Sequence, residues 1–277
     1  MPKIGIVGNE DSKARSDCYI RVEIDACKGV EINLESKVLS MYGNSIKKLA
    51  KDVFDFFQIE NVRCYINDKG ALPFVLCARL ETAIKRAIPD IKKEYLLPKI
   101  PVKENISFKE RFRRSRLYLP GNEPKFMINA GLHGADGIIL DLEDSVSVTE
   151  KDAARILVRN ALRNVDFYNC ERMVRINQLP MGLEDLKFII PHNVNMILIP
   201  KCESPSQVEH INQKIKNLAP DKKHSIFLMP IIESALGVIN AYNIASSCPE
   251  IAALAIGLED YTADIGTQRT LEGKESI

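Results

Sequence analysis

Residues 226–233 read IFLMPIIE, and residues 254–260 read LAIGLED. Each stretch is an apolar run that closes on an acidic residue, Glu233 in the first and Asp260 in the second. Short, continuously apolar runs are typical of strands in a parallel sheet with both faces buried. Functional groups of such proteins gather where the strands end, so this pair of carboxylates is the first candidate site, interpreted as a site for a hard metal ion.

The same kind of run recurs along the second part of the chain. Runs of strand character begin near residues 116, 137, 172, 196, 226 and 254. Their mean separation of about 28 residues is the size of one strand-and-helix unit. Six such units predict an α/β fold, either a (β/α)8-type barrel or an open parallel sheet. A full barrel takes about 250 residues, so residues 111–277 are expected to lack its last two units.

The first 90 residues have a different pattern. Apolar and polar residues alternate over residues 20–24 and 30–34, which predicts two strands joined as a hairpin. Helical spacing over residues 45–57 and 73–88, with a third strand near 62–66, completes a small α+β domain.

Charged residues and prolines without periodicity fill residues 91–110, which predicts a linker. The expected domains are therefore 1–90 and 111–277.

Composition excludes several classes of protein. The formal net charge is +1, so no overall field would hold nucleic acid or an anionic membrane. No apolar stretch reaches the roughly 20 residues that span a bilayer, and the start lacks a signal sequence, so a cytoplasmic protein is expected. The seven cysteines form no C-x-x-C pair and the four histidines no H-E-x-x-H motif, which argues against a disulfide framework and against zinc.

Carboxylate ligands without histidine or cysteine favour Mg²⁺ or Mn²⁺ at Glu233 and Asp260. Under the alternative interpretation, Glu233 caps the following helix and Asp260 pairs with Arg269. Arg175 ends another strand-like run, and its planar guanidinium suits a bidentate grip on a substrate carboxylate.

Arg175 has an alternative as well, an internal ion pair with Glu143 or Asp144. Lys201, at a further strand end, could form a Schiff base, but a solvated lysine is the favoured interpretation.

Six motifs resemble the citrate lyase β subunit, a citryl lyase of the HpcH/HpaI aldolase family. They are RRSRLYLPGN at 113–122, LDLED at 140–144, VRIN at 174–177, IPK at 199–201, IESALG at 232–237 and GLEDY at 257–261. The resemblance implies that Glu233 and Asp260 hold Mg²⁺ and that Arg175 binds the substrate carboxylate. Glu143 and Asp144 are the further catalytic candidates beside it.

The N-terminal region resembles the citrate lyase γ subunit, an acyl carrier protein. The motifs are residues 8–17, IRV at 20–22, LESKV at 34–38, DKGAL at 68–72 and ARLETA at 78–83. That family attaches a phosphoribosyl-dephospho-CoA arm to a serine in a Gly-Thr-x-Glu-Ser-x-Asp stretch. Here the stretch carries about three inserted residues, which leaves Ser12 as the preferred attachment site, Ser16 as the alternative, and an unmodified serine as the third possibility.

Together the two resemblances imply a fusion of carrier and lyase that acts in citrate fermentation. The expected cofactors are Mg²⁺ and the covalent arm. The expected partners are the citrate lyase α subunit and other chains of a hetero-oligomer, a prosthetic-group transferase, and a citryl or acetyl thioester substrate. The alternatives are a carrier or assembly component with an inactive lyase part, and a lyase of malyl-CoA or citramalyl-CoA type.

Overall fold

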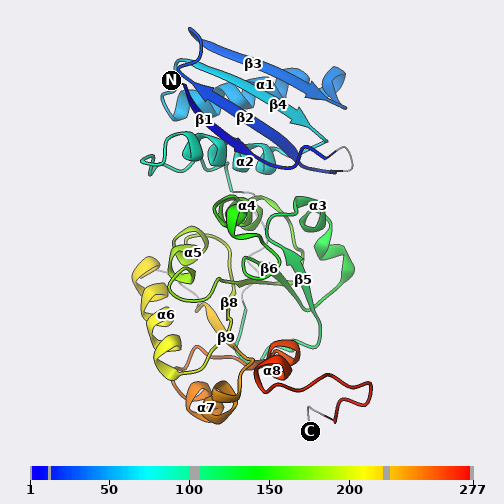
Figure 1. Cartoon of the computed structure of the whole chain (residues 1–277), viewed down its shortest axis with the longest axis vertical. Helices are drawn as coiled ribbons and strands as arrows, with labels where there is room; N and C mark the ends of the chain where they lie inside the picture. The colour runs from blue at the N-terminus through cyan, green and yellow to red at the C-terminus, as the bar shows by residue number, and fades with distance from the viewer. Residues whose placement is uncertain (1, 12–13, 100–106, 221–224, 275–277) are drawn as a thin grey trace. The chain divides into compact units, whose positions relative to one another are not determined.

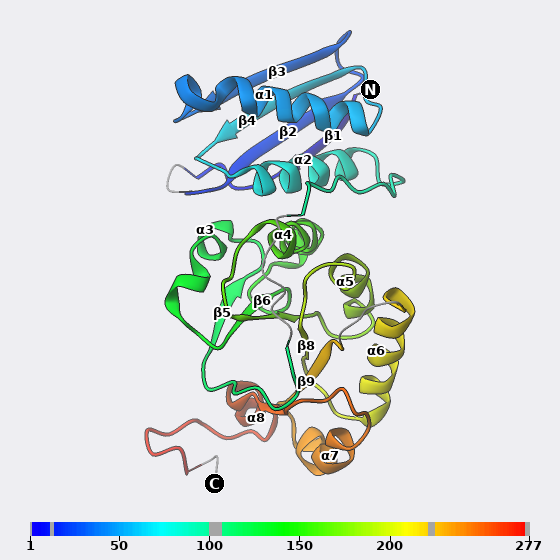
Figure 2. The same cartoon turned by 180° about the vertical axis from the view of Figure 1, so that it is seen from behind.

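The computed structural model describes residues 2–11, 14–99, 107–220 and 225–274. The chain forms two compact units (Figures 1 and 2). Unit 1 comprises Met1–Pro101 with two later segments, Gly121–Asn129 and Ser147–Asp166. Unit 2 comprises Val102–Pro120, Ala130–Val146 and Phe167–Ile277. Part of the predicted linker lies outside the described residues, and its remainder up to residue 99 contains neither helix nor strand.

Unit 1 is built on a four-stranded sheet in the order β1-β2-β4-β3. Its elements are β1 (Lys3–Val7), β2 (Cys18–Ile24), β3 (Val30–Ser36), α1 (Leu39–Phe56), β4 (Val62–Asp68), α2 (Pro73–Ala87), α3 (Pro124–Met127) and α4 (Lys151–Asn164). Helices α1 and α2 cover one face of the sheet (Figure 2). The small α+β region expected at the N-terminus is present.

The predicted hairpin is wrong. Strand β4 lies between β2 and β3, antiparallel to the first and parallel to the second. The physical reason is burial, because Val62, Cys64 and Ile66 of β4 are fully buried and this strand takes a central position. Strand β3 is less buried and forms an edge. Strand β1 was not predicted; it pairs antiparallel with β2 at the other edge.

Helix α2 has most of its residues buried inside unit 1, between β1 and β2 on one side and α4 on another. Arg159 of α4 and Glu81 of α2 are both fully buried and form a bidentate ion pair, with N–O distances of 3.0 and 2.7 Å. A buried charge that loses its partner costs several kcal/mol, so removing either member of this pair would destabilise the packing of the two helices. Ala153 of α4 belongs to the same hydrophobic core as the sheet.

Unit 2 contains a parallel six-stranded sheet whose strands lie side by side in chain order, β5 to β10. Its elements are β5 (Arg116–Pro120), η1 (Ala130–His133), β6 (Gly137–Asp141), β7 (Glu171–Arg175), α5 (Gly182–Ile189), β8 (Met196–Ile199), α6 (Pro205–Leu218), β9 (Phe227–Ile232), α7 (Ala235–Ala245), β10 (Ala255–Ile256) and α8 (Leu258–Asp264). A short helix, η2 (Val148–Glu150), precedes α4 in unit 1. Consecutive parallel strands joined by helices form a curled sheet, consistent with a partial (β/α) barrel.

All six predicted strand starts agree with the structure to within one residue. Strands β6, β8 and β9 are buried at every residue and β7 at every residue but Arg175, which is why the runs were visible in the sequence. Whether two units are missing stays a prediction.

Among the described residues, no helix combines the length and apolar character needed to cross a membrane.

Candidate functional site

Arg175 lies at the end of β7, directly opposite Asp141 at the end of β6 in the sheet register. Its guanidinium grips Asp141 with two hydrogen bonds, from Nε to Oδ1 at 2.6 Å and from Nη2 to Oδ2 at 2.8 Å. Burial opposes ionisation of Asp141, but the hydrogen bonds and charge of Arg175 outweigh it and lower the pKa of the carboxyl. Asp141 also accepts hydrogen bonds from the N–H and hydroxyl of Ser145, so its carboxylate is anchored on two sides.

The third nitrogen of the guanidinium faces the other two acids of the LDLED motif. Nη1 lies 3.1 Å from Glu143 Oε2 and 3.5 Å from Asp144 Oδ2. Glu143 is buried and accepts a hydrogen bond from Gln178 at 3.0 Å, whereas Asp144 is exposed. Burial raises the pKa of Glu143. Of the two interpretations of Arg175, the internal ion pair is the one present in this structure, with Asp141 as an additional partner.

Glu233 directly follows β9 and is 5% exposed. Its Oε1 accepts a 2.6 Å hydrogen bond from the backbone N–H of Lys201, a residue held at φ +46°. Burial raises the pKa of Glu233 to about 7, and the charges of Glu143 and Asp260 add to the effect, while the Lys201 N–H and Arg175 oppose it. The charges of Glu143 and Arg175 therefore reach Glu233 from other strand ends of the sheet.

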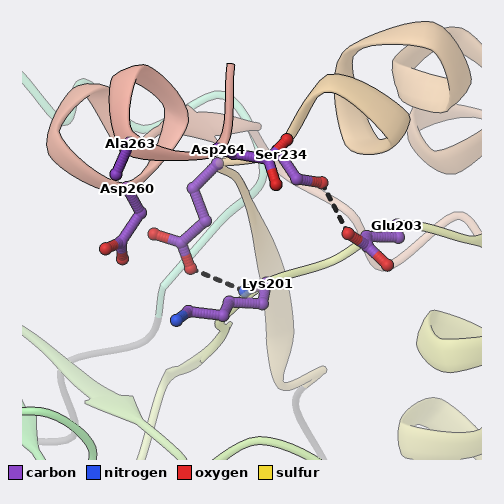
Figure 3. Close-up of a pocket in the computed structure, with 7 residues that line it drawn as sticks. Lys201, Glu203, Ser234, Asp260, Ala263 and Asp264 are labelled. Carbon is purple, nitrogen blue, oxygen red and sulfur yellow. Dashed lines mark hydrogen bonds between the residues drawn. The ribbon is translucent and has the colours of Figure 1, made fainter. Parts of the chain in front are cut away.

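Asp260 lies in the first turn of α8 and lines a cavity of about 280 Å³ together with Glu233 and Lys201. Figure 3 shows the carboxylate of Asp260 on one side of this cavity and the Lys201 side chain below it. Gly257 permits this close arrangement, because a Cβ atom there would lie 2.4 Å from Glu233 Oε2.

Three further polar residues at the cavity hold its walls together. Ser234 Oγ donates to Glu203 Oε1 at 2.7 Å (Figure 3). The same oxygen accepts from the Gly237 N–H at 3.1 Å. Asp264, at the end of α8, accepts from the N–H of Ala235 at the start of α7. The cap of α7 is thus Ser234, so the alternative in which Glu233 caps this helix is wrong. Arg269 pairs with Glu259.

The donor set fits a hard cation. Two carboxylates meet at one cavity, one of them with a raised pKa that a bound cation would relieve. No group of three or more His, Cys, Asp or Glu side chains suited to a metal occurs in the described parts of the chain, so any ion at this pair would need water or substrate ligands as well.

Replacing Ser234 with alanine is expected to lower the free energy of unfolding by about 1–2 kcal/mol, because one hydroxyl supplies both the α7 cap and a hydrogen bond to Glu203. Urea titration measures the change. The matched control is Ser246→Ala at the exposed other end of α7, expected to stay within about 0.5 kcal/mol. Equal effects of the two substitutions would contradict the double role of Ser234.

The N-terminal motifs also meet in space, within unit 1. Ser12 lies outside the described residues. Ser16 has φ +56°, and its backbone N–H donates to the carbonyl of Lys69. The N–H of Lys69 in turn donates to the carbonyl of Asp17. Asp17 is buried and forms a bidentate pair with Arg79, both distances being 2.9 Å. The end of the serine-bearing stretch is therefore fixed to the DKGAL and ARLETA motifs.

The fold and the site define an α/β protein with carboxylates and an arginine at the ends of parallel strands, joined to a small carrier-like α+β region. The chain belongs to the HpcH/HpaI aldolase/citrate lyase family, which matches residues 114–277. Residues 5–87 match a second family, of acyl carrier type, described as the malonate decarboxylase delta subunit. Both expected resemblances are confirmed.

Curated relatives include lyases of two kinds. The citrate lyase subunit beta of Leuconostoc mesenteroides subsp. cremoris is 39% identical over 61% of this chain and 57% of its own length. The mitochondrial citramalyl-CoA lyase of Homo sapiens is 29% identical over 58% of this chain and 51% of its own length. A solved citrate lyase beta subunit from M. tuberculosis, complexed with oxaloacetate and magnesium, is 26% identical, with a TM-score of 0.46 over 58% of this chain and 67% of that one. The chain thus spans little more than half the length of these curated relatives.

Sequence reasoning included Asp141 and Gly257 in motifs without assigning them a role, and it missed Gln178, Glu203 and Asp264. The role of Asp141 could have been found, because it ends the strand neighbouring that of Arg175 at the same level of the sheet. The others act through contacts between distant loops, for which the sequence contains no local signal.

Proposed function

We propose that this chain is a citrate lyase component that carries an acyl-thioester arm and cleaves its citryl thioester to oxaloacetate and an acetyl carrier. The observation that carries the proposal is the shared cavity of Glu233 and Asp260, coupled to the Arg175 cluster, in a chain that joins lyase and carrier families. Its partners would be the citrate lyase α subunit, other chains of the complex and a prosthetic-group transferase.

Glu233 and Asp260 would hold Mg²⁺, which when bound polarises the oxygen of the departing oxo acid. Arg175 would orient a carboxylate of the substrate through Nη1, the nitrogen that faces Glu143 and the exposed Asp144. Asp141 fixes the guanidinium through its other two nitrogens, so the substrate would meet a pre-oriented donor. In the reaction the hydroxyl proton leaves, the carbon–carbon bond breaks to give oxaloacetate, and the thioester enolate takes a proton to become acetyl.

The phosphoribosyl-dephospho-CoA arm would be attached to Ser12, with Ser16 as the alternative. A thioester tethered to the same chain as the lyase site has a high effective concentration there without any new contact. Residues 91–110 would serve as the connection between the domains 1–90 and 111–277.

The test combines two measurements on the full chain co-expressed with a prosthetic-group transferase. Intact mass reports the arm, and release of oxaloacetate from citryl thioester reports the lyase. Both are expected. An arm without cleavage would favour a carrier or assembly role with an inactive lyase part, and the absence of both would refute the proposal.

A second candidate is a lyase of free citramalyl-CoA or malyl-CoA, favoured by the similarity to the human citramalyl-CoA lyase. The carrier match at residues 5–87 argues against it, because a free CoA ester needs no attached carrier. Cleavage of CoA esters by the purified, unmodified chain would support this candidate over the first.

Arg175→Lys is expected to raise KM for the citryl thioester about tenfold, with a smaller change in kcat. Lysine keeps the charge but cannot hold Asp141 with two nitrogens while presenting a third. Steady-state kinetics measures both constants. Lys187→Arg, an exchange of the same two residue types at an exposed pair on α5, is the control. An unchanged KM would remove Arg175 from substrate binding.

A further inference from the structure

Unit 1 contains an apolar groove that the proposed lyase chemistry does not use. It has a volume of about 570 Å³ and runs between α1 and the connection from β4 to α2. Tyr42, Ile46 and Leu49 form the α1 side, and Ala71 and Leu72 form the other. Tyr42 and Leu72 are 53% and 43% exposed, so the groove is open to solvent. Its size falls within the range of small-molecule sites.

The serine-bearing stretch ends beside this groove. The backbone of Ser16 and Asp17 is paired with Lys69 through two hydrogen bonds of 3.1 and 2.9 Å. The next residue, Gly70, already lines the groove. Asp68 fixes this connection by accepting hydrogen bonds from the N–H groups of Gly70 and Ala71 at 3.0 and 2.7 Å. An arm on Ser16, the alternative attachment site, would therefore start beside the Gly70 end of the groove.

The charges beside the groove suit a ligand that is partly apolar and partly anionic. Lys48 lines both the groove and a neighbouring cavity of about 670 Å³, which Lys47 and Lys51 line as well. The acidic residues on the same helix are Asp52 in the groove and Asp55 in the neighbouring cavity. Apolar walls with lysines at one side match a pantetheine-type chain that carries phosphate groups.

We propose that this groove receives the retracted acyl arm of the carrier, with the thiol end of the arm between α1 and the β4–α2 connection. The inference rests on the proposed function, since it requires the arm. In the retracted state the thioester lies against Ile46 and Leu49, on the apolar wall formed by α1. Transfer to the lyase site then requires the arm to leave the groove.

The test traps the arm by a disulfide. Ser45 lines the groove and is exposed, so Ser45→Cys adds a thiol there with minimal change in shape. Ser40→Cys is the matched control, because Ser40 is exposed on the same helix and does not line the groove. Each full-length variant is produced with the prosthetic-group transferase, its arm is freed of acyl groups, and diamide is added as the oxidant. Two thiols lose one hydrogen each to diamide and form the disulfide.

Intact mass and peptide mapping give the result. We expect the arm to be linked to residue 45 in most molecules of Ser45→Cys and to residue 40 in few molecules of Ser40→Cys. Equal trapping at residues 45 and 40 would overturn the assignment of the groove, and so would the absence of trapping at both residues in chains that carry the arm. Neither result would contradict the carrier function. Chains in which no arm is detected before oxidation would refute the carrier function, and this inference with it.

Discussion

Glu233→Gln is expected to abolish Mg²⁺-dependent cleavage of citryl thioester and, at the same time, to stabilise the fold at alkaline pH. Glutamine keeps the oxygen that accepts the Lys201 N–H but removes the negative charge that a cation needs. Oxaloacetate release measures the activity. Calorimetric titration of the purified variant with Mg²⁺ measures binding directly, and no heat of binding is expected.

The stability change has a definite pH dependence in the metal-free protein. The pKa of Glu233 is raised from 4.5 to about 7, so the ionised form is disfavoured in the folded state. This penalty is absent below about pH 4.5, grows between 4.5 and 7, and is complete above 7. Glu233→Gln removes it, so the variant should gain on the order of 2–3 kcal/mol over the parent at pH 8, and less at pH 5.5.

Urea unfolding at pH 8 and pH 5.5 measures the stability gain. Glu209→Gln, at an exposed position on α6, is the control and should change neither the activity nor the stability. Full Mg²⁺-dependent activity in Glu233→Gln would refute the metal assignment. A stability gain of the same size at both pH values would show that burial of the charge is not its cause.

Gly257→Ala should weaken Mg²⁺ binding about a hundredfold, equivalent to about 2.7 kcal/mol, although it changes no ligand. The new methyl group would lie 2.4 Å from Oε2 and 2.9 Å from Cβ of Glu233, closer than real atoms approach. The backbone of Gly257 is held by its N–H to Ile232 at 2.9 Å, so the Glu233 side chain has to move. Because φ of Gly257 is −100°, alanine adopts the same backbone and the effect is steric.

Titration calorimetry with Mg²⁺ measures the affinity, and circular dichroism checks that the fold is kept. Gly43→Ala is the matched control, because its Cβ would meet only the flexible end of the Leu39 side chain on α1 and should leave Mg²⁺ binding unchanged. Parental affinity in Gly257→Ala would mean that the position of Glu233 seen here is not the one that binds the ion.

The sequence predicted β6, β8 and β9 of unit 2 well because these strands are buried along their whole length and are almost entirely apolar. Sequence reasoning failed to pair β2 and β3 correctly. Alternation of apolar and polar residues identifies a strand but not the strand beside it, and β4 lies between these two because its buried residues favour a central position. The acids and the arginine were found because they interrupt apolar runs. The roles of Gly257 and of the Lys201 N–H were not found, because their effect on Glu233 depends on distances between separate loops.

The hydrogen bond that aims Glu233 comes from the main chain of Lys201, in a left-handed conformation, and not from a side chain. Every residue type except proline supplies the same donor, and residues such as asparagine or glycine tolerate that conformation more easily than lysine. The orientation of the carboxylate is therefore a property of the path of the loop, and alanine scanning of side chains would leave this contribution undetected.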